Sequence, residues 1–382
     1  MDANARRAKL LLLALAAVGA LLFYMTPPKI GDIVEYWAAG RLNLQGHNPY
    51  DPVKMLELER SAGYSRSWPV MMVNPPHVLT LAMPFGALPF ETAARLWRVL
   101  NAAILIGSCS ILWKLAGGST MLVGTFYLVA LTFFPSLVAL TVGQTSILGL
   151  LGLALLLWFD DRDHMIGFGA AIALLLVKPH VVYLVGAAFA IWWLQVRDRK
   201  VLLGLGLAGI VFLIALSWNP HFYNHYLQMR RMECLAQFTQ SSPGMFIRLA
   251  TSRWTEFGLQ FLPLVLGFAY LFTRLPRRRG SEWNWEREMP ALMTISVATA
   301  AYSWVFDQVV LLVAAVPLFA QVIQAGTAQL IVLVALWLSL GGVVLLLAGQ
   351  GVNALWYFWI PWVFLPLLPS LSRGPQGAGQ QG

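Results

Sequence analysis

The sequence predicts an all-α polytopic integral membrane protein, because its composition and its apolar runs both require lipid as the main solvent. Of its 382 residues, 58% are hydrophobic and only 11% are charged, whereas about 25% of the residues of an average soluble domain are charged. Apolar runs that approach the roughly 20 residues of a membrane-crossing helix recur along the chain. The 16 Trp and 11 Tyr suit aromatic belts at the two membrane interfaces.

We expect about twelve transmembrane helices. The first run, "LLLLALAAVGALLFYM", resembles a signal peptide, but no small-x-small cleavage pattern follows it, so we interpret it as the uncleaved first helix. Several runs are short or broken, which is tolerated where a helix lines a protein cavity rather than lipid. The expected spans are 8–26, 90–113, 119–141, 143–159, 165–177, 180–195, 200–216, 255–273, 289–304, 308–323, 326–348 and 353–370.

The basic residues set the expected orientation. Lys and Arg cluster at residues 5–9, 197–200 and 274–279, and short basic loops lie on the cytoplasmic side of a membrane. With an even number of helices, both termini are then cytoplasmic. Two long extracytoplasmic loops follow from this topology, at about 27–89 and 217–254.

The sequence argues against several functional classes. The net charge is +9, but the basic residues are scattered without interleaved aromatic residues, so we expect no nucleic-acid partner. Cys109 and Cys234 form no motif. The chain has no P-loop, dinucleotide-binding glycine pattern, HExxH or GxSxG. A substrate donor should therefore come from the membrane rather than from a cytoplasmic nucleotide.

Asp32 stands out because it begins a polar segment between apolar runs. The segment "GDIVEYWAAGRLNL" has helical apolar spacing and predicts a short interfacial helix. Asp32 either caps the first N–H groups of this helix or acts as a general base at the membrane surface. Glu35 lies one turn later on the same side, as a solvated or paired side chain or as a partner of Asp32. The following "QGHNPYDP" predicts a structured turn.

Lys178 and Asp307 are ionisable residues that interrupt apolar runs, which is costly unless they are paired or face water. Lys178 either snorkels to the interface or receives an anion, most plausibly phosphate, with support from Gln144 and His180. Asp307 pairs with Lys178 or with an arginine from a long loop, or it binds a substrate hydroxyl. In "NPPH", Asn74 and His77 either shape a turn or bind a polar ligand.

Four segments in order resemble glycosyltransferase family 87, whose members are integral-membrane enzymes of the GT-C class. They are "GDIVEYWAAGRLNLQGHNPYDP", "NPPHVLTLAMPFGALPFETAARLW", "VGQTSILGLLGLALLL" and "ALLLVKPHVVYLV". The resemblance covers about residues 20–200 and, more weakly, "QFTQSSPG" at 237–244. It implies a single GT-C-like domain over residues 1–382, with its core in 1–200, C-terminal helices in 255–370 and a disordered cytoplasmic tail at 371–382.

The resemblance also implies an activity. Family members transfer a sugar, typically mannose, from a polyprenyl-phosphate carrier to a lipid-linked or glycan acceptor on the extracytoplasmic face of the plasma membrane. Asp32 matches the catalytic base, and Lys178 would stabilise the departing phosphate. The expected phosphate or sugar contacts are His180, Gln144, His77, Arg248 and Arg253, together with Asn74, Asp307 and Glu35.

Two positions depart from the family pattern. The family often has Tyr where this chain has Asn74, and His near the position of Asp307. No carboxylate cluster has a clear metal-ligand spacing, and we assign no cofactor, although some GT-C enzymes use a divalent cation. The alternatives are a transporter or flippase of a lipid-linked or anionic substrate, with Lys178 and Asp307 on its path, and a non-catalytic assembly subunit. The large outer loops and the lack of an obvious inverted repeat favour the enzyme.

Overall fold

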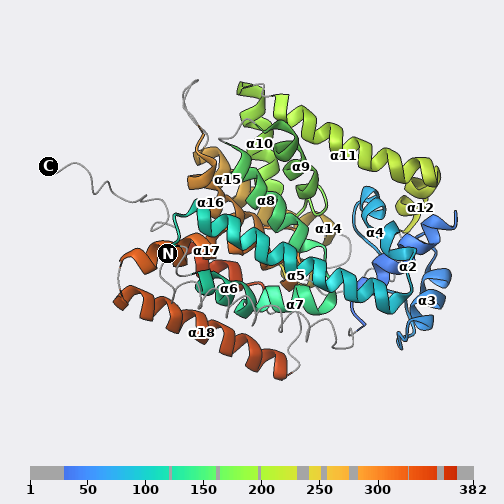
Figure 1. The fold of residues 1–382 in the computed structure, drawn as a ribbon, viewed down its shortest axis with the longest axis horizontal. Coiled ribbons are helices and arrows are strands. Elements are labelled where there is room, and N and C mark those ends of the chain that lie inside the picture. The colour runs from blue at the N-terminus through green and yellow to red at the C-terminus, as the bar shows by residue number, and fades with distance from the viewer. Residues whose placement is uncertain are drawn as a thin grey trace, which may run out of the picture. The chain divides into compact units, whose positions relative to one another are not determined.

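The computed structural model of the chain contains α-helices and 3-10 helices in the parts that it describes, which agrees with the predicted all-α class (Figure 1). The expected features that lie outside the described residues include the basic cluster at 5–9, the first span at 8–26, Cys234, Arg253 and the tail at 371–382. The described residues are 30–119, 123–160, 164–196, 199–229, 241–250, 256–274, 283–325, 327–350 and 357–367.

Internal contacts divide the chain into two compact units. Unit 1 comprises Met1–Ile104, Leu140–Gln144 and Val211–Leu235, and unit 2 comprises Leu105–Ala139, Thr145–Ile210 and Ala236–Gly382. Three helices pass from one unit into the other: α5 (Phe90–Leu115), α7 (Phe134–Val142) and α11 (Arg199–Trp218).

In unit 1, the expected first loop is largely helical. It contains α2 (Ile33–Leu44), α3 (Pro52–Ser61), the 3-10 helix η1 (Pro76–Val78) and α4 (Leu79–Gly86), and α12 (Phe222–Met229) belongs to the same unit. The short helix after Asp32 is therefore confirmed, and its position at the membrane interface stays a prediction. Ten of the twelve residues of α2 are buried, because α3 and α4 pack against it.

Two glycines explain how closely α2 and α4 approach each other. A Cβ atom at Gly40 would lie 2.5 Å from the carbonyl oxygen of Ala82, and one at Gly86 would collide with the backbone of Arg41. Backbone atoms cannot move aside as a flexible side chain can, so only glycine fits at these two positions. The contact fixes α4 across the middle of α2.

The turn predicted from "QGHNPYDP" is confirmed. The side-chain oxygen of Asn48 accepts a hydrogen bond from the backbone N–H of Tyr50 at 2.9 Å. Asp51 then caps α3, because its carboxylate accepts hydrogen bonds from the N–H groups of Val53 and Lys54 at 2.9 and 3.2 Å. Asn48 and Asp51 thus have structural roles typical of turn and cap residues.

Unit 2 is a bundle of helices in which α8 packs on α9 and η4, α10 packs on α16, and α17 packs on α18. Its elements are α6 (Val123–Thr132), α8 (Ser146–Asp160), α9 (Met165–Leu175), α10 (Tyr183–Val196), α13 (Pro243–Ala250), α14 (Glu256–Leu259), α15 (Leu262–Arg274), α16 (Trp285–Ala298), η4 (Val305–Leu311), α17 (Leu312–Ala325), α18 (Thr327–Gly349), α19 (Ile360–Phe364) and η6 (Leu365–Leu367).

Within the described residues, four helical stretches are long and apolar enough to cross a membrane: Phe90–Leu115, Arg199–Trp218, Val305–Ile323 and Leu330–Leu347. Four others are apolar but shorter. The expected span at 119–141 is interrupted at Phe133, between α6 and α7. These findings support a membrane protein, and the number of twelve crossings stays a prediction.

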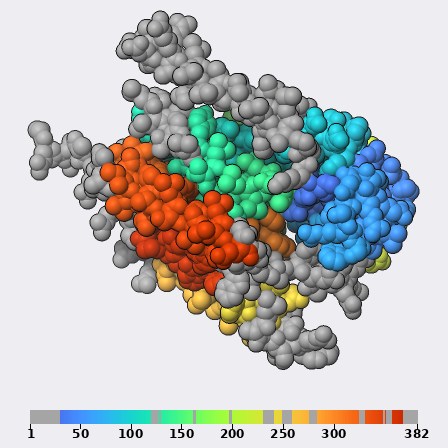
Figure 2. All heavy atoms as spheres, turned by 90° about the horizontal axis from the view of Figure 1, so that it is seen from below, coloured from blue at the N-terminus to red at the C-terminus, as the bar shows by residue number. Residues whose placement is uncertain are grey.

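Helix α18 presents an apolar surface to its surroundings. It lies at the surface in the orange part of Figure 2, and its exposed large side chains include Ile331, Leu338 and Leu346. Side chains of this kind on the outside of a long apolar helix are suited to contact with lipid tails.

Candidate functional site

Asp32 lies at the start of α2, but it does not cap that helix. Its backbone has helical torsion angles, with φ −65° and ψ −14°, and its side chain forms no capping hydrogen bond. The capping interpretation is therefore wrong. The partly exposed carboxylate instead accepts a hydrogen bond from the side-chain amide of Gln144.

Gln144 is held at both ends of its carboxamide group. Its nitrogen donates to Asp32, while its oxygen accepts a hydrogen bond of 3.0 Å from the hydroxyl group of Tyr36. The side chains of Tyr36 and Gln144 are buried. The sequence predicts that Gln144 contacts the donor phosphate or sugar. In the structure its amide contacts Asp32, the predicted base.

Two glycines allow the segment before Gln144 to reach the start of α2. A Cβ atom at Gly31 would lie 2.6 Å from the Cα atom of Val142. Gly143 has a φ of +79°, which disfavours other residues, and a Cβ atom there would lie 2.9 Å from Cβ of Ile33. The indole N–H of Trp97 then donates to the carbonyl oxygen of Gly143 at 2.6 Å. The positive φ and the close contact with Ile33 explain why the "VGQTS" segment has a glycine at position 143.

Other carboxylates lie near Asp32 in unit 1. Glu35 is buried within α2. Burial raises the pKa of Tyr64, the charge of Arg66 opposes that increase, and the carboxylates of Glu59, Asp32 and Glu35 add to it. The phenol of Tyr64 is therefore within electrostatic range of the predicted base.

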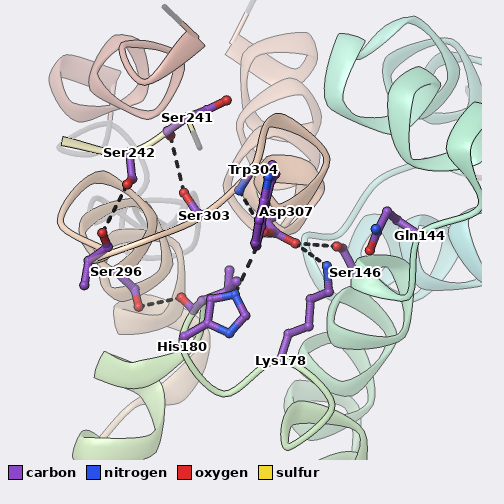
Figure 3. A network of polar contacts seen from close by, with 12 residues as sticks. Gln144, Ser146, Lys178, His180, Ser241, Ser242, Ser296, Ser303, Trp304 and Asp307 are labelled. Atoms are coloured by element: carbon purple, nitrogen blue, oxygen red, sulfur yellow. Dashed lines mark hydrogen bonds and ion pairs between the residues drawn. The ribbon is translucent and has the colours of Figure 1, made fainter. Parts of the chain in front are cut away.

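A second polar cluster lies in unit 2, around Asp307 (Figure 3). The ammonium group of Lys178 donates to Oδ1 of Asp307 at 2.7 Å, and both side chains are buried. The hydroxyl of Ser146 donates to the same oxygen at 2.6 Å. Oδ2 accepts a hydrogen bond of 2.9 Å from the backbone N–H of Trp304. Of the alternatives for Asp307, the structure contains the ion pair with Lys178.

Aromatic rings flank this ion pair. The ammonium group of Lys178 lies 4.6 Å from the ring centroid of Phe306, a distance suited to a cation–π interaction. His180 stacks on Tyr302 with ring centroids 4.5 Å apart. Its Nε2 atom is 3.9 Å from Oδ2 of Asp307, which is too long for a hydrogen bond but close enough to respond to the carboxylate charge.

The chain positions this cluster in one turn and in the first turns of two helices. Lys178 lies in the turn between α9 and α10, Asp307 in the first part of η4, and Ser146 at the first position of α8. The backbone N–H of Ser241 donates to the carbonyl oxygen of Ser303 at 2.7 Å. The "SSPG" segment thus holds the residues that lead into Asp307 (Figure 3).

The remaining predicted residues have the following places. Asn74 is buried and lies just before η1, and His77 is half-buried and lies within η1. The 3-10 helix η1 packs against α12. Arg248 is half-buried in the last turn of α13. In the part of the chain that the structure describes, no three His, Cys, Asp or Glu side chains are grouped as metal ligands.

Sequence reasoning missed Tyr36 and Ser146. Tyr36 follows Asp32 by four residues in the predicted helix, a spacing that puts the two side chains on one face. Ser146 belongs to "VGQTS", the same segment as Gln144. Trp304 was missed for a different reason, since it contributes a backbone N–H rather than a side chain.

Ionisable groups buried among apolar helices mark functional sites in membrane proteins. The apolar helices and the buried Lys178–Asp307 pair therefore define the class as a membrane protein that carries ionisable side chains among its apolar helices. The sequence profile of glycosyltransferase family 87 matches residues 73–289, more than half of the chain. The chain belongs to this family, and it is a glycosyltransferase.

The profile match confirms the family predicted from the four segments. It includes Gln144, Lys178 and His180, whereas Asp32 precedes the matched residues and Asp307 follows them. No curated protein and no solved structure shows significant similarity to the chain.

Proposed function

We propose that this glycosyltransferase transfers mannose from a polyprenyl-phosphate donor to a hydroxyl group of a lipid-linked or glycan acceptor. The reaction occurs on the extracytoplasmic face of the plasma membrane, with inversion at the anomeric carbon and Asp32 as the general base. The main support is the Asp32 carboxylate, which is partly exposed, does not cap its own helix and accepts an oriented hydrogen bond from Gln144.

The transfer needs a base because an alcohol is a weak nucleophile at neutral pH. Asp32 takes the proton of the acceptor hydroxyl as the acceptor oxygen bonds to the anomeric carbon of the sugar. The bond from that carbon to the phosphate oxygen breaks, and the polyprenyl phosphate leaves with the electron pair. Asp32 then releases its proton to water, so the base is restored after each transfer.

We assign stabilisation of the departing phosphate to Lys178, with His180 beside it. The resemblance to the family and the charge of Lys178 support this assignment. An ammonium group buried among apolar helices is expensive without a counter-ion. Asp307 supplies that counter-ion at 2.7 Å, so the pair allows Lys178 to stay charged where it is buried.

A membrane-borne donor agrees with the surface of the protein. Long apolar helices such as α11 and α18 carry exposed aliphatic side chains, which suit the hydrocarbon chain of a polyprenyl phosphate as well as bulk lipid. The chain also has no P-loop and no dinucleotide-binding glycine pattern.

The test compares the wild type with Asp32→Asn, in host membranes that supply the acceptors and receive radiolabelled mannosyl polyprenyl phosphate. We expect label to enter a lipid or glycan with the wild type and a loss of at least about 100-fold in rate with the variant, since general-base catalysis contributes roughly 10²–10⁴-fold. Asp51→Asn is the matched control. Asp51 caps α3, and Asn caps a helix equally well.

Two results would count against the proposal. If the wild type transfers no label, the donor is wrong. If Asp32→Asn transfers label as fast as Asp51→Asn, Asp32 is not the base.

A further inference from the structure

We propose that Tyr36 and Gln144 are positioning residues that together orient the Asp32 carboxylate and favour its ionised form. This inference rests on the proposed role of Asp32 as the base. It gives Gln144 a role different from phosphate or sugar binding, and it gives a role to Tyr36, which the sequence did not single out.

The carboxamide of Gln144 can present either its oxygen or its NH₂ group to Asp32, and an ionised carboxylate, which only accepts hydrogen bonds, selects the NH₂ group. The Tyr36 hydroxyl donates to the amide oxygen at 3.0 Å, so the amide nitrogen faces the carboxylate and donates to it. With the amide reversed, its oxygen would face the carboxylate and repel it. The Tyr36 hydroxyl, which donates at the other end of the amide, thus helps to hold Gln144 in this orientation.

The burial of Tyr36 and Gln144 makes the orientation of the amide important for Asp32. Tyr36 is 1% exposed and Gln144 is 4% exposed, so water cannot easily replace a missing partner for either polar group. The ring of Tyr36 packs against Trp97 with centroids 5.8 Å apart. Trp97 also donates to the carbonyl oxygen of Gly143, the residue before Gln144. One indole therefore restrains both partners of the hydrogen bond.

The helix supplies the rest of the geometry. Asp32 and Tyr36 are four residues apart at the start of α2, so their side chains lie on one face of the helix, where a single side chain can bridge them. A donor to one carboxylate oxygen favours the ionised form, which is the form that accepts a proton. It also fixes the plane of the carboxylate, and a base must be placed precisely to act.

The experiment uses Tyr36→Phe and Gln144→Leu in the full-length protein, with the labelled mannosyl donor and host membranes. We expect Tyr36→Phe to lower kcat by roughly 10-fold, as for the loss of a hydrogen bond to a neutral amide, and Gln144→Leu by roughly 100-fold, as for the loss of one to a charged group. KM for the donor should stay within about 2-fold, because the residues act on the base. The acid limb of the pH–rate profile should move to higher pH in both variants.

The double variant adds a test of coupling. Tyr36 acts only through Gln144 in this proposal, so Tyr36→Phe should have little further effect once Gln144→Leu is present. The same amide acting on the donor would give the opposite kinetic pattern, with a raised KM and an unchanged pH profile. That pattern would overturn the proposal.

A second measurement does not depend on the substrate. Carbodiimides react with protonated carboxyl groups, so the pH dependence of dicyclohexylcarbodiimide labelling at Asp32, read by mass spectrometry, reports its ionisation. The midpoint should move to higher pH in Tyr36→Phe and Gln144→Leu. An unchanged midpoint in both variants would overturn the proposal even if their activity were low.

Matched controls separate these effects from general damage. Tyr226→Phe removes a hydroxyl that donates to the carbonyl oxygen of Val73, and Gln260→Leu removes an amide that donates to the carbonyl oxygen of Ala301. Neither should move the labelling midpoint. If Asp32→Asn is inactive but the midpoint does not shift in the test variants, the positioning role fails and the base survives. If Asp32→Asn is active, the proposed function itself fails.

Discussion

Lys178 and Asp307, 129 residues apart in the sequence, form a buried ion pair with 2.7 Å between Nζ and Oδ1. Two further donors, the hydroxyl of Ser146 and the backbone N–H of Trp304, satisfy the carboxylate. A buried pair of this kind contributes little net stability when it is compared with apolar residues of the same size. We therefore expect the pair in unit 2 to serve the reaction more than the stability of the fold.

Removal of either charge alone should destabilise the protein. In Lys178→Met the buried carboxylate of Asp307 has lost its counter-ion, and we expect a cost of about 3–5 kcal/mol. The double variant Lys178→Met/Asp307→Leu should recover most of that stability while transferase activity stays lost. Thermal unfolding of the detergent-purified protein, followed by tryptophan fluorescence, measures the first effect, and label transfer measures the second. A double variant no more stable than the single one would show that the pair is not coupled.

Ser146→Ala tests the hydroxyl that donates to the buried carboxylate. Its bond to Asp307 is 2.6 Å long, and the loss of a hydrogen bond to a charged group costs about 1.5–3 kcal/mol. Ser110→Ala is the control, because the Ser110 hydroxyl donates only within its own helix, to the carbonyl oxygen of Ile106 at 2.7 Å. Chemical unfolding should therefore separate the two variants. Equal stabilities would mean that Ser146 contributes nothing special to the cluster.

Gly40→Ala tests the close approach of α2 and α4. The added methyl group would lie 2.5 Å from the carbonyl oxygen of Ala82, and overpacking of this kind costs about 1–3 kcal/mol. Gly107→Ala in α5 is the matched change, since a Cβ atom there meets nothing within 4 Å. It should stabilise the helix by about 0.5–1 kcal/mol. Unfolding temperatures that move in the same direction would contradict the packing described for α2 and α4.

Glu59 should make the stability of unit 1 depend on pH. It is fully buried in α3, outside the candidate spans, and its carboxylate accepts hydrogen bonds from the backbone N–H of Val70. Burial raises the pKa of Glu59 from 4.5 to about 8, against a smaller opposing effect of the Val70 hydrogen bond. Between these two values the folded protein holds a proton that the unfolded chain has released.

The stability that this proton contributes is fully present below about pH 4.5 and is lost as the pH rises through about 8. Glu59→Gln keeps an acceptor for Val70 and removes the titration. The variant should therefore have a flatter profile of unfolding temperature against pH and should be more stable than the wild type at pH 8. A wild-type profile that rises between pH 5 and 8, with no difference from the variant, would rule this effect out.

Local patterns in the sequence predict much of this structure. Composition was enough to indicate a membrane protein, and the polar interruptions identified Asp32, Lys178 and Asp307. The four ordered segments were enough to indicate the family, which the profile match confirms. Turn residues such as Asp51 were also predictable, because a cap acts over only two or three positions of the chain.

Contacts between distant residues could not be predicted in this way. The helical spacing around Asp32 indicated one apolar face, yet ten of the twelve residues of α2 are buried. Gln144 lies 112 residues after Asp32, and only close backbone packing at Gly31 and Gly143 brings the two together. The sequence by itself therefore determined the class, the family and the candidate base. The tertiary structure decided which groups contact Asp32 and which charge Lys178 balances, because those partners depend on packing rather than on local periodicity.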